Sequence, residues 1–227
     1  MWNFNNLSVD EIANKYENIL LENKMYLLHN NIILQKDFNN ITIIKSNELS
    51  TISNEKLINL TLDARLILFG GIAFSGYNEN FNANNGIYKN ALNHQQEIEE
   101  TKKYEKLYNK ISKTLHYKNI IILTHMPFYD WCKNQEFVKG FIYINGHTHR
   151  NFFYDDGDFR IYSDNQIGYN NLSVFLKYLY VENEYDIFEN YLNGIYEITS
   201  EQYNNFNKGK NITINYNREA YKLYMLK

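Results

Sequence analysis

The stretch NIIILTHMPFYDW, residues 119–131, contains the pattern on which the fold prediction depends. Its apolar run, residues 119–124, passes directly into a loop that begins with His125. The stretch FIYINGHTHR, residues 141–150, repeats this arrangement, with the apolar run 141–145 followed by Gly146. Short, continuous apolar runs bounded by loop residues are typical of strands buried on both faces. The two runs therefore predict adjacent strands of an α/β fold, each followed by a histidine-bearing loop.

Patterns of helices and further strands surround these two runs. A helix is predicted over residues 8–23, because Ser8 and Glu11 have the spacing of a capping box and apolar residues follow at helical intervals. Two more helices are predicted over 53–62 and 87–116, and a helical turn over 200–206. A tight turn is expected at 29–31. Further short strands are expected at 25–28, 32–34, 41–44, 65–69, 152–154, 159–162, 174–181, 195–199 and 211–215.

Composition indicates one large domain with a small addition. The chain has 227 residues and a mass of 27.2 kDa, with 44% hydrophobic and 22% charged residues, which argues against disordered and fibrous classes. The sequence becomes rich in Tyr and Asn after about residue 168. We therefore expect an α/β domain over 1–167 and a small C-terminal subdomain or extension over 168–227.

Charge and hydropathy also argue against several partners. The longest apolar run, 66–74, is about half of what spans a bilayer, and the N-terminus shows no signal-peptide pattern, so no membrane association is expected. A net charge of −3 and a pI of about 6.1 give no broad basic surface for nucleic acid. A single cysteine, Cys132, excludes an internal disulfide framework and agrees with a cytoplasmic protein.

Three histidines follow the two central strands and predict a metal site. His147 and His149 are separated by one residue after Gly146, and His125 lies in the other loop, which Pro127 stiffens. Imidazoles that converge from neighbouring strand ends suit Zn, Mn or Fe. Each histidine taken alone is also compatible with an ordinary loop residue. The remaining histidines, His29, His94 and His116, lack this context and are expected to be structural or exposed.

Other candidate motifs are weaker. Gly71 and Gly76 have the spacing of a phosphate-binding loop, but Tyr77 and Asn78 stand where lysine and serine or threonine are required. Cys132 has no orienting partners that the sequence reveals, and no catalytic residue is identified. The acidic run 155–158 is typical of a hairpin turn, although its carboxylates are also possible partners for metal-binding histidines.

The two loop motifs together resemble the calcineurin-like metallophosphoesterases. The stretches LTHMPFYDW (123–131) and INGHTHR (144–150) match the last two parts of that superfamily's ordered signature, T/S-H-x-P and G-H-x-H. The earlier parts, D-x-H, G-D-x-x-[DN] and G-N-H-[DE], are absent, and the only Gly-Asp pair, at 157–158, lies out of order. In some bacterial members the G-N-H-E box leads through a Leu-Trp pair into a helix, much as Met1 and Trp2 lead into the helix predicted here.

The resemblance implies that this chain is the C-terminal half of such an enzyme. Residues 1–167 would form the C-terminal portion of an α/β/β/α sandwich that lacks its N-terminal strands. A separately encoded N-terminal half is then the expected partner, and a phosphoester the expected substrate. The isolated chain is expected to be poorly soluble or dependent on that partner, because apolar faces and edges of the sheet would be exposed.

The resemblance also implies roles for the three histidines. His125 and His147 resemble ligands of one metal and His149 a ligand of a second, in a site that holds two divalent ions of Mn, Fe or Zn. In the complete enzymes a metal-activated hydroxide attacks phosphorus. Neutral imidazoles are required for metal binding, so affinity should fall below about pH 6. Three ligands alone should not hold two metals tightly.

Two further interpretations remain open beside a half-enzyme. One is a non-catalytic remnant or interaction module of the same fold. The other is a mononuclear zinc protein that uses His125, His147 and His149. An adjacent reading frame that encodes D-x-H and G-N-H-E would favour a split enzyme over a remnant. In an enzyme, the loop 75–86 and the segment after 168 are expected to set substrate specificity.

Overall fold

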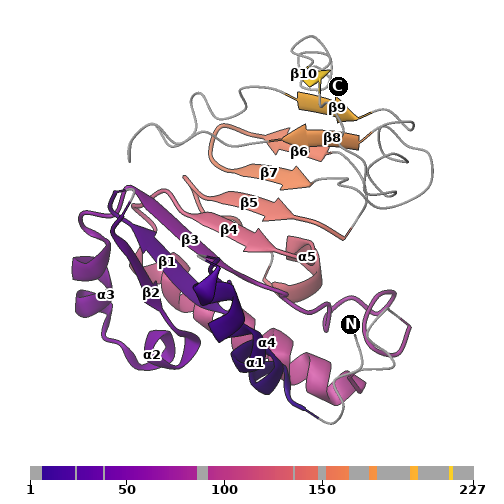
Figure 1. Ribbon diagram of the computed structural model, residues 1–227. Coiled ribbons are helices and arrows are strands. Elements are labelled where there is room, and N and C mark those ends of the chain that lie inside the picture. The colour runs from indigo at the N-terminus through magenta and orange to yellow at the C-terminus, as the bar shows by residue number, and fades with distance from the viewer. Residues whose placement is uncertain are drawn as a thin grey trace.

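The computed structural model describes residues 7–23, 25–37, 39–85, 92–134, 136–147 and 152–163, together with three short strands beyond residue 170. Its centre is a seven-stranded mixed sheet with the order β2-β1-β3-β4-β5-β7-β6 (Figure 1). Strands β3, β4, β5 and β7 are parallel, whereas β1 is antiparallel to β2 and β3, and β6 to β7. The strands are β1 Asn31–Gln35, β2 Ile41–Ile44, β3 Leu66–Gly71, β4 Ile121–Thr124, β5 Ile142–Asn145, β6 Phe152–Asp155 and β7 Arg160–Ser163. The predicted α/β class is confirmed.

Five helices accompany the sheet in the described part of the chain. They are α1 Val9–Glu22, α2 Ser46–Thr51, α3 Asn54–Thr61, α4 His94–Thr114 and α5 Phe128–Trp131. The capping box predicted at Ser8 and Glu11 is present at the start of α1. A second capping box, formed by Asn93 and Gln96, starts α4, so the described helix begins at His94 rather than at the predicted residue 87.

Several sequence predictions need correction. Residues 25–28 form no strand, because both edges of β1 are already paired, with β2 and with β3. The described residues of the turn between β1 and β2 are 36–37 and 39–40, so this turn does not lie at 29–31. Helices α2 and α5 were not predicted, since six and four residues are too few to show a helical apolar period.

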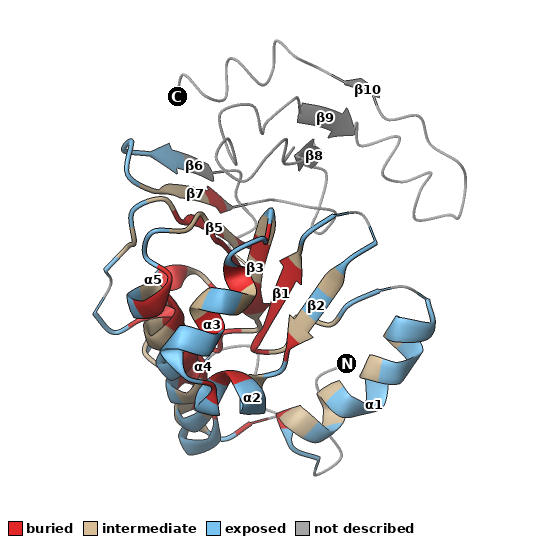
Figure 2. Ribbon diagram, turned by 90° about the vertical axis from the view of Figure 1, so that its left-hand side faces the viewer, coloured by how far each residue is buried: buried red, intermediate tan, exposed pale blue. Residues whose placement is uncertain are grey.

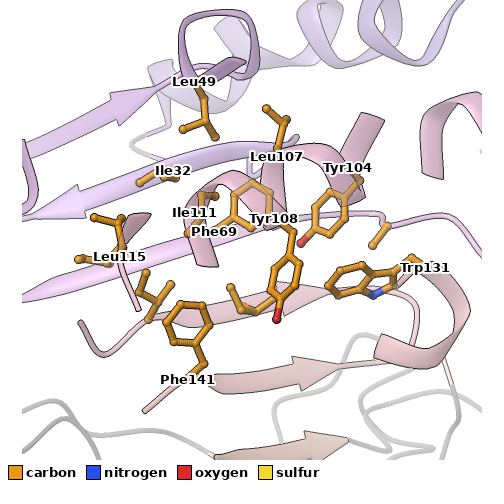
Figure 3. Close-up of a cluster of buried hydrophobic side chains, with 14 of the residues drawn as sticks. Ile32, Leu49, Phe69, Tyr104, Leu107, Tyr108, Ile111, Leu115, Trp131 and Phe141 are labelled. Carbon is orange, nitrogen blue, oxygen red and sulfur yellow. The ribbon is translucent and has the colours of Figure 1, made fainter. Parts of the chain in front are cut away.

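The main core lies between the sheet and the helices α2 to α5, which share one face of it (Figure 2). Aromatic side chains fill its centre (Figure 3). The ring of Tyr104 on α4 stacks on Phe69 of β3 at a centroid distance of 4.9 Å and meets the edge of Trp131 on α5 at 4.8 Å. These three side chains are almost completely buried. Their packing ties α4 and α5 to the middle of the sheet.

The other face of the sheet is also apolar. Strand register aligns Ile33, Leu68, Ile121 and Ile142 in one row across β1, β3, β4 and β5. Because directly opposite residues project from the same face, this row forms a second apolar surface, separate from the core beneath the helices. Ile33, Ile121 and Ile142 are buried, whereas Leu123 is 39% exposed. Strands that are apolar on both faces belong to sheets covered on both sides.

Three strands beyond residue 170 form a separate sheet with the order β10-β9-β8. They are β8 Val174–Lys177, β9 Ile195–Ile198 and β10 Asn215–Tyr216. Strands predicted at 174–181 and 195–199 are present in shorter form, and β10 begins at the last residue of the predicted 211–215. The boundary predicted near 168 and the helical turn predicted at 200–206 lie outside the described residues. No helix in the described part of the chain has both the length and the apolar character needed to span a bilayer.

The polar stretch after β3 is a loop of fixed shape. Glu97 of α4 is fully buried and accepts hydrogen bonds from the Ser75 hydroxyl, at 3.2 Å, and from the Ala83 backbone N–H. Thr101, one turn further along α4, accepts a hydrogen bond from the backbone N–H of Gly76 at 3.1 Å. The loop 72–85 is therefore anchored to α4 at both of its ends.

Gly70 should be intolerant of any side chain. It lies beside Leu123 in the β3–β4 pair, and a Cβ atom built on Gly70 would stand 2.1 Å from the Leu123 carbonyl oxygen. Because that oxygen belongs to the backbone, Gly70→Ala should lower the free energy of unfolding by about 3 kcal/mol or more, measured by urea denaturation. Gly157→Ala is the control: it has a φ of +88° and open space around it, so only a cost of about 1–2 kcal/mol is expected. Equal losses in the two variants would contradict the steric argument.

Glu97 should make stability depend on pH. Burial raises the pKa of Glu97 above its ordinary value of 4.5, although the hydrogen bonds from Ala83 and Ser75 oppose this shift. The folded state then holds the proton more tightly, so stability falls as pH rises from 4.5 through the raised pKa. Glu97→Gln does not titrate and cannot accept both hydrogen bonds.

The loss of unfolding free energy caused by Glu97→Gln should therefore be largest at low pH, about 1–3 kcal/mol, and should shrink toward pH 7. Chemical denaturation between pH 4 and 7 measures this difference. Glu99→Gln, on the exposed side of α4, should show no such trend. A loss that grows with pH would mean that the ionised form of Glu97 is the favoured one.

Candidate metal centre at the carboxyl edge of the sheet

Strands β3, β4 and β5 are parallel, so their carboxyl ends lie at one edge of the sheet. The loop after β4 is held against the end of β3, because the N–H groups of His125 and Met126 donate to the carbonyls of Gly71 and Ile72, both at 3.2 Å. The Thr124 hydroxyl donates to the Met126 carbonyl at 2.7 Å and tightens the turn. These backbone contacts fix the position of His125.

The structure brings His125 and His147 together, as the sequence predicts. Their ring centroids are 5.3 Å apart and the ring planes are inclined by 71°. Register explains this proximity: Thr124 pairs with Asn145, so the residues that follow them leave the sheet side by side. A Cβ atom on Gly146 would lie 3.6 Å from the His125 Nδ1 atom, which is ordinary contact distance. His149 lies outside the described residues.

Backbone strain is concentrated at this edge. The three described non-glycine residues with positive φ are Asn30, Ala73 and His147, with φ values of 58°, 52° and 63°. Asn30 precedes β1, which is antiparallel to β3, so it reaches the same edge as the other two. A non-glycine side chain in the left-handed region costs about 1–2 kcal/mol, and such residues are often found at functional sites.

A buried carboxylate accompanies His147. Asp130 of α5 is only 4% exposed, and its Oδ1 atom accepts a hydrogen bond from the Asn78 side chain at 2.8 Å. Burial raises the pKa of Asp130, whereas the hydrogen bond from Asn78 and the charge of the nearby His147 act to lower it. The backbone N–H of Tyr77 also donates to the Asp130 carbonyl at 3.1 Å. The loop 72–85 is thus bound to α5 as well as to α4.

An aromatic side chain from the same loop completes the surroundings of His147. The rings of Phe81 and His147 meet edge to face, with their centroids 5.9 Å apart. Phe81 is itself half exposed. The His147 ring therefore contacts the rings of Phe81 and His125, and Asp130 interacts with it electrostatically. Asp130, Asn78 and Phe81 were not predicted as site residues. Of these three residues, only Asp130 could have been anticipated from the sequence, because it lies five residues after His125 in the same segment as Pro127.

The other histidines and the acidic run occupy different places. The His29 Nε2 atom lies 2.8 Å from the Asp10 carboxylate, which links the start of β1 to α1, and His116 is exposed. The Nδ1 atom of His94 is buried and makes no hydrogen bond with the described residues. Asp155 ends β6 and pairs with Arg160 at 2.7 Å, and Asp156 begins the turn to β7, where its carboxylate accepts hydrogen bonds from the N–H groups of Asp158 and Phe159. The turn predicted for this run is confirmed.

The nitrogen and oxygen donors near this edge suit a metal ion of intermediate hardness. Two imidazoles and a nearby carboxylate are ligand or supporting groups for Zn, Mn and Fe. Among the described residues, no group of three or more His, Cys, Asp or Glu side chains is arranged to hold a metal. The third predicted ligand, His149, lies outside the described residues. His125 and His147 are therefore the described part of the candidate centre.

Comparisons of the chain with protein family models, with curated proteins and with solved structures found no match. The contact between His125 and His147 at the edge of the sheet is therefore the structural feature that bears most directly on function.

Proposed function

We propose that this chain is the histidine-bearing half of a metal-dependent phosphoester hydrolase of the calcineurin-like type. The observation that supports this most directly is the contact between His125 and His147, whose rings lie 5.3 Å apart at the ends of two parallel strands. The two motifs of the resemblance are thereby adjacent in space, as a shared metal centre requires. In open α/β sheets, active sites form beyond the carboxyl ends of strands.

The finer fold that we propose is one half of an α/β/β/α sandwich. The apolar row formed by Ile33, Leu68, Ile121 and Ile142 supports it, because such a face requires a second layer. Ile33, Ile121 and Ile142 of this row are already buried within the chain itself, so the task that we assign to a partner polypeptide is to bring further ligands to the metal edge. The motifs D-x-H and G-N-H-E, absent from this chain, would belong to that partner.

Each residue of the site has a definite task in this proposal. His125, His147 and His149 would hold two divalent ions through neutral imidazole nitrogens. Such ions would supply positive charge at the phosphate and would make water a better nucleophile near neutral pH. The strained backbone at His147 and the edge of Phe81 restrict the orientation of the His147 ring. Asp130 interacts electrostatically with His147 and would add negative charge to the surroundings of the metal.

The two other interpretations make different predictions about metal. A non-catalytic remnant would show no binding that depends on the site histidines. A mononuclear zinc protein would bind one zinc tightly without any partner. A half-site should bind zinc weakly, through its own histidines, and should hydrolyse phosphoesters only together with the missing half.

The first test is zinc binding by the full chain. A competition titration with a chromophoric chelator should show weak binding that His147→Ala or His125→Ala weakens by at least about tenfold. His116→Ala, at an exposed histidine beyond the end of α4, should leave the affinity unchanged. The full chain alone should not hydrolyse bis(4-nitrophenyl) phosphate. Activity should appear when a polypeptide with D-x-H and G-N-H-E is added.

Zinc binding that is unchanged in both site variants would contradict the proposed centre. Tight binding of one zinc by the chain alone would favour the mononuclear protein. Absence of histidine-dependent zinc binding, together with absence of hydrolysis in the presence of the added polypeptide, would favour a remnant of the fold.

The second test concerns Asp130. Asp130→Asn keeps the size of the side chain but removes the negative charge that interacts with His147, so zinc affinity should fall. Asp63→Asn, at an exposed aspartate after α3, is a matched control and should bind zinc like the unaltered chain. Circular dichroism should show that both variants are folded. Unchanged zinc affinity in Asp130→Asn would remove Asp130 from the site.

A further inference from the structure

The segment from residue 7 to residue 26, which contains α1, has an apolar surface. Half of the large hydrophobic side chains that are exposed in the described part of the chain lie in this segment. They are Leu7, Tyr16, Ile19, Leu21, Met25 and Tyr26. Single exposed hydrophobic residues are normal on a protein surface, whereas a cluster of them marks an interaction site. The cluster therefore indicates that this segment contacts a partner.

Polar contacts fix which side of α1 faces the domain. Asp10 and Glu17, two turns apart, are both bound to the rest of the domain. Their side-chain partners are His29 and Lys103 for Asp10, and Lys45 for Glu17. Tyr16 and Ile19 lie on a different side of the helix and are 51% and 54% exposed. Because residues three apart are neighbours on a helix, Tyr16 and Ile19 form one apolar stripe that exists before any partner binds.

Two charged residues lie in a row beside this stripe. Lys15 and Glu22 are both exposed. They are two turns, about 10.5 Å, apart along the helix, which is too far for them to pair with each other. Glu11, one turn before Lys15, is engaged in the capping box with Ser8. A partner that fits this row therefore carries a negative and a positive charge at the same spacing.

The chain itself offers that pattern. We propose that the stripe binds a second copy of this chain, with the two α1 helices packed antiparallel about a two-fold axis. Tyr16 of each copy then packs on Ile19 of the other, and Lys15 of each copy lies near Glu22 of the other. Such an interface is self-complementary, as a two-fold dimer requires. A parallel arrangement would instead bring equal charges together, which is unfavourable.

The charge of α1 argues against a membrane as the partner. The helix contains the acidic residues Asp10, Glu11, Glu17 and Glu22, and Lys15 is the one basic residue in its sequence. Helices that lie on anionic lipid are rich in Lys and Arg on their polar face. The excess of negative charge disfavours nucleic acid for the same reason. Self-association avoids this difficulty, because opposite charges meet.

The dimer should be weak. A contact limited to two short helices falls at the low end of interface sizes, below about 1,200 Å², so association should depend on concentration. The inference goes beyond the proposed function and does not rest on it, because none of the histidines proposed to bind metal takes part.

The test is sedimentation velocity of the full chain without added metal. Between about 1 and 300 µM the chain should pass from monomer to dimer and associate no further. Ile19→Ser should raise the dissociation constant of the dimer by about tenfold or more, because apolar area is lost on both copies. Leu62→Ser is the matched control: Leu62 is 53% exposed at the end of α3, and this variant should dimerise like the unaltered chain.

Charge variants test the antiparallel arrangement. Lys15→Glu and Glu22→Lys should each weaken the dimer by about fivefold or more, because two attractive pairs become repulsive. An equal mixture of these two variants should dimerise again, since each chain then meets the opposite charges on the other. This recovery also shows that both variants are folded.

A chain that stays monomeric throughout this range would overturn the proposal, as would association that continues beyond a dimer. Equal effects of Ile19→Ser and Leu62→Ser would overturn it too, and a mixture of the charge variants that fails to recover would refute the antiparallel pairing. A monomer that binds phosphatidylcholine vesicles in an Ile19-dependent way would assign the stripe to a membrane instead.

Discussion

The parallel pairing of β3, β4 and β5 is the constraint on which the rest of the structure depends. The register joins Gly70 to Leu123 and Thr124 to Asn145, so the three loops that carry polar side chains begin at the same level. The close approach of β3 and β4 requires a glycine at position 70, because any Cβ atom would strike the neighbouring backbone. This pairing brings His125 and His147 into contact without any bound ligand.

The loop 72–85 links this edge to the helices. Its contacts with Glu97 and Thr101 on α4 hold it from one side, and those with Asp130 on α5 hold it from the other. The ring of Phe81 in this loop contacts His147. A change in the anchoring of this loop should therefore affect the proposed metal centre.

Most of the framework could be predicted from local patterns. The runs 119–124 and 141–145 predicted β4 and β5, and the capping box at Ser8 predicted the start of α1. Predictions failed where a segment had a suitable composition but no free partner, as at 25–28 beside the fully paired β1. They failed also for α5, because four residues carry no periodic signal.

The sequence by itself determined which strands are central and that a histidine follows each of two of them, because burial and loop chemistry act over a few consecutive residues. Tertiary structure decided which residues surround those histidines. Asn78 and Asp130 are 52 positions apart, and their hydrogen bond exists only because the loop folds back onto α5. Phe81 and His147 are likewise distant in the chain and meet through the same fold. Contacts of this kind depend on how layers pack, which no local pattern records.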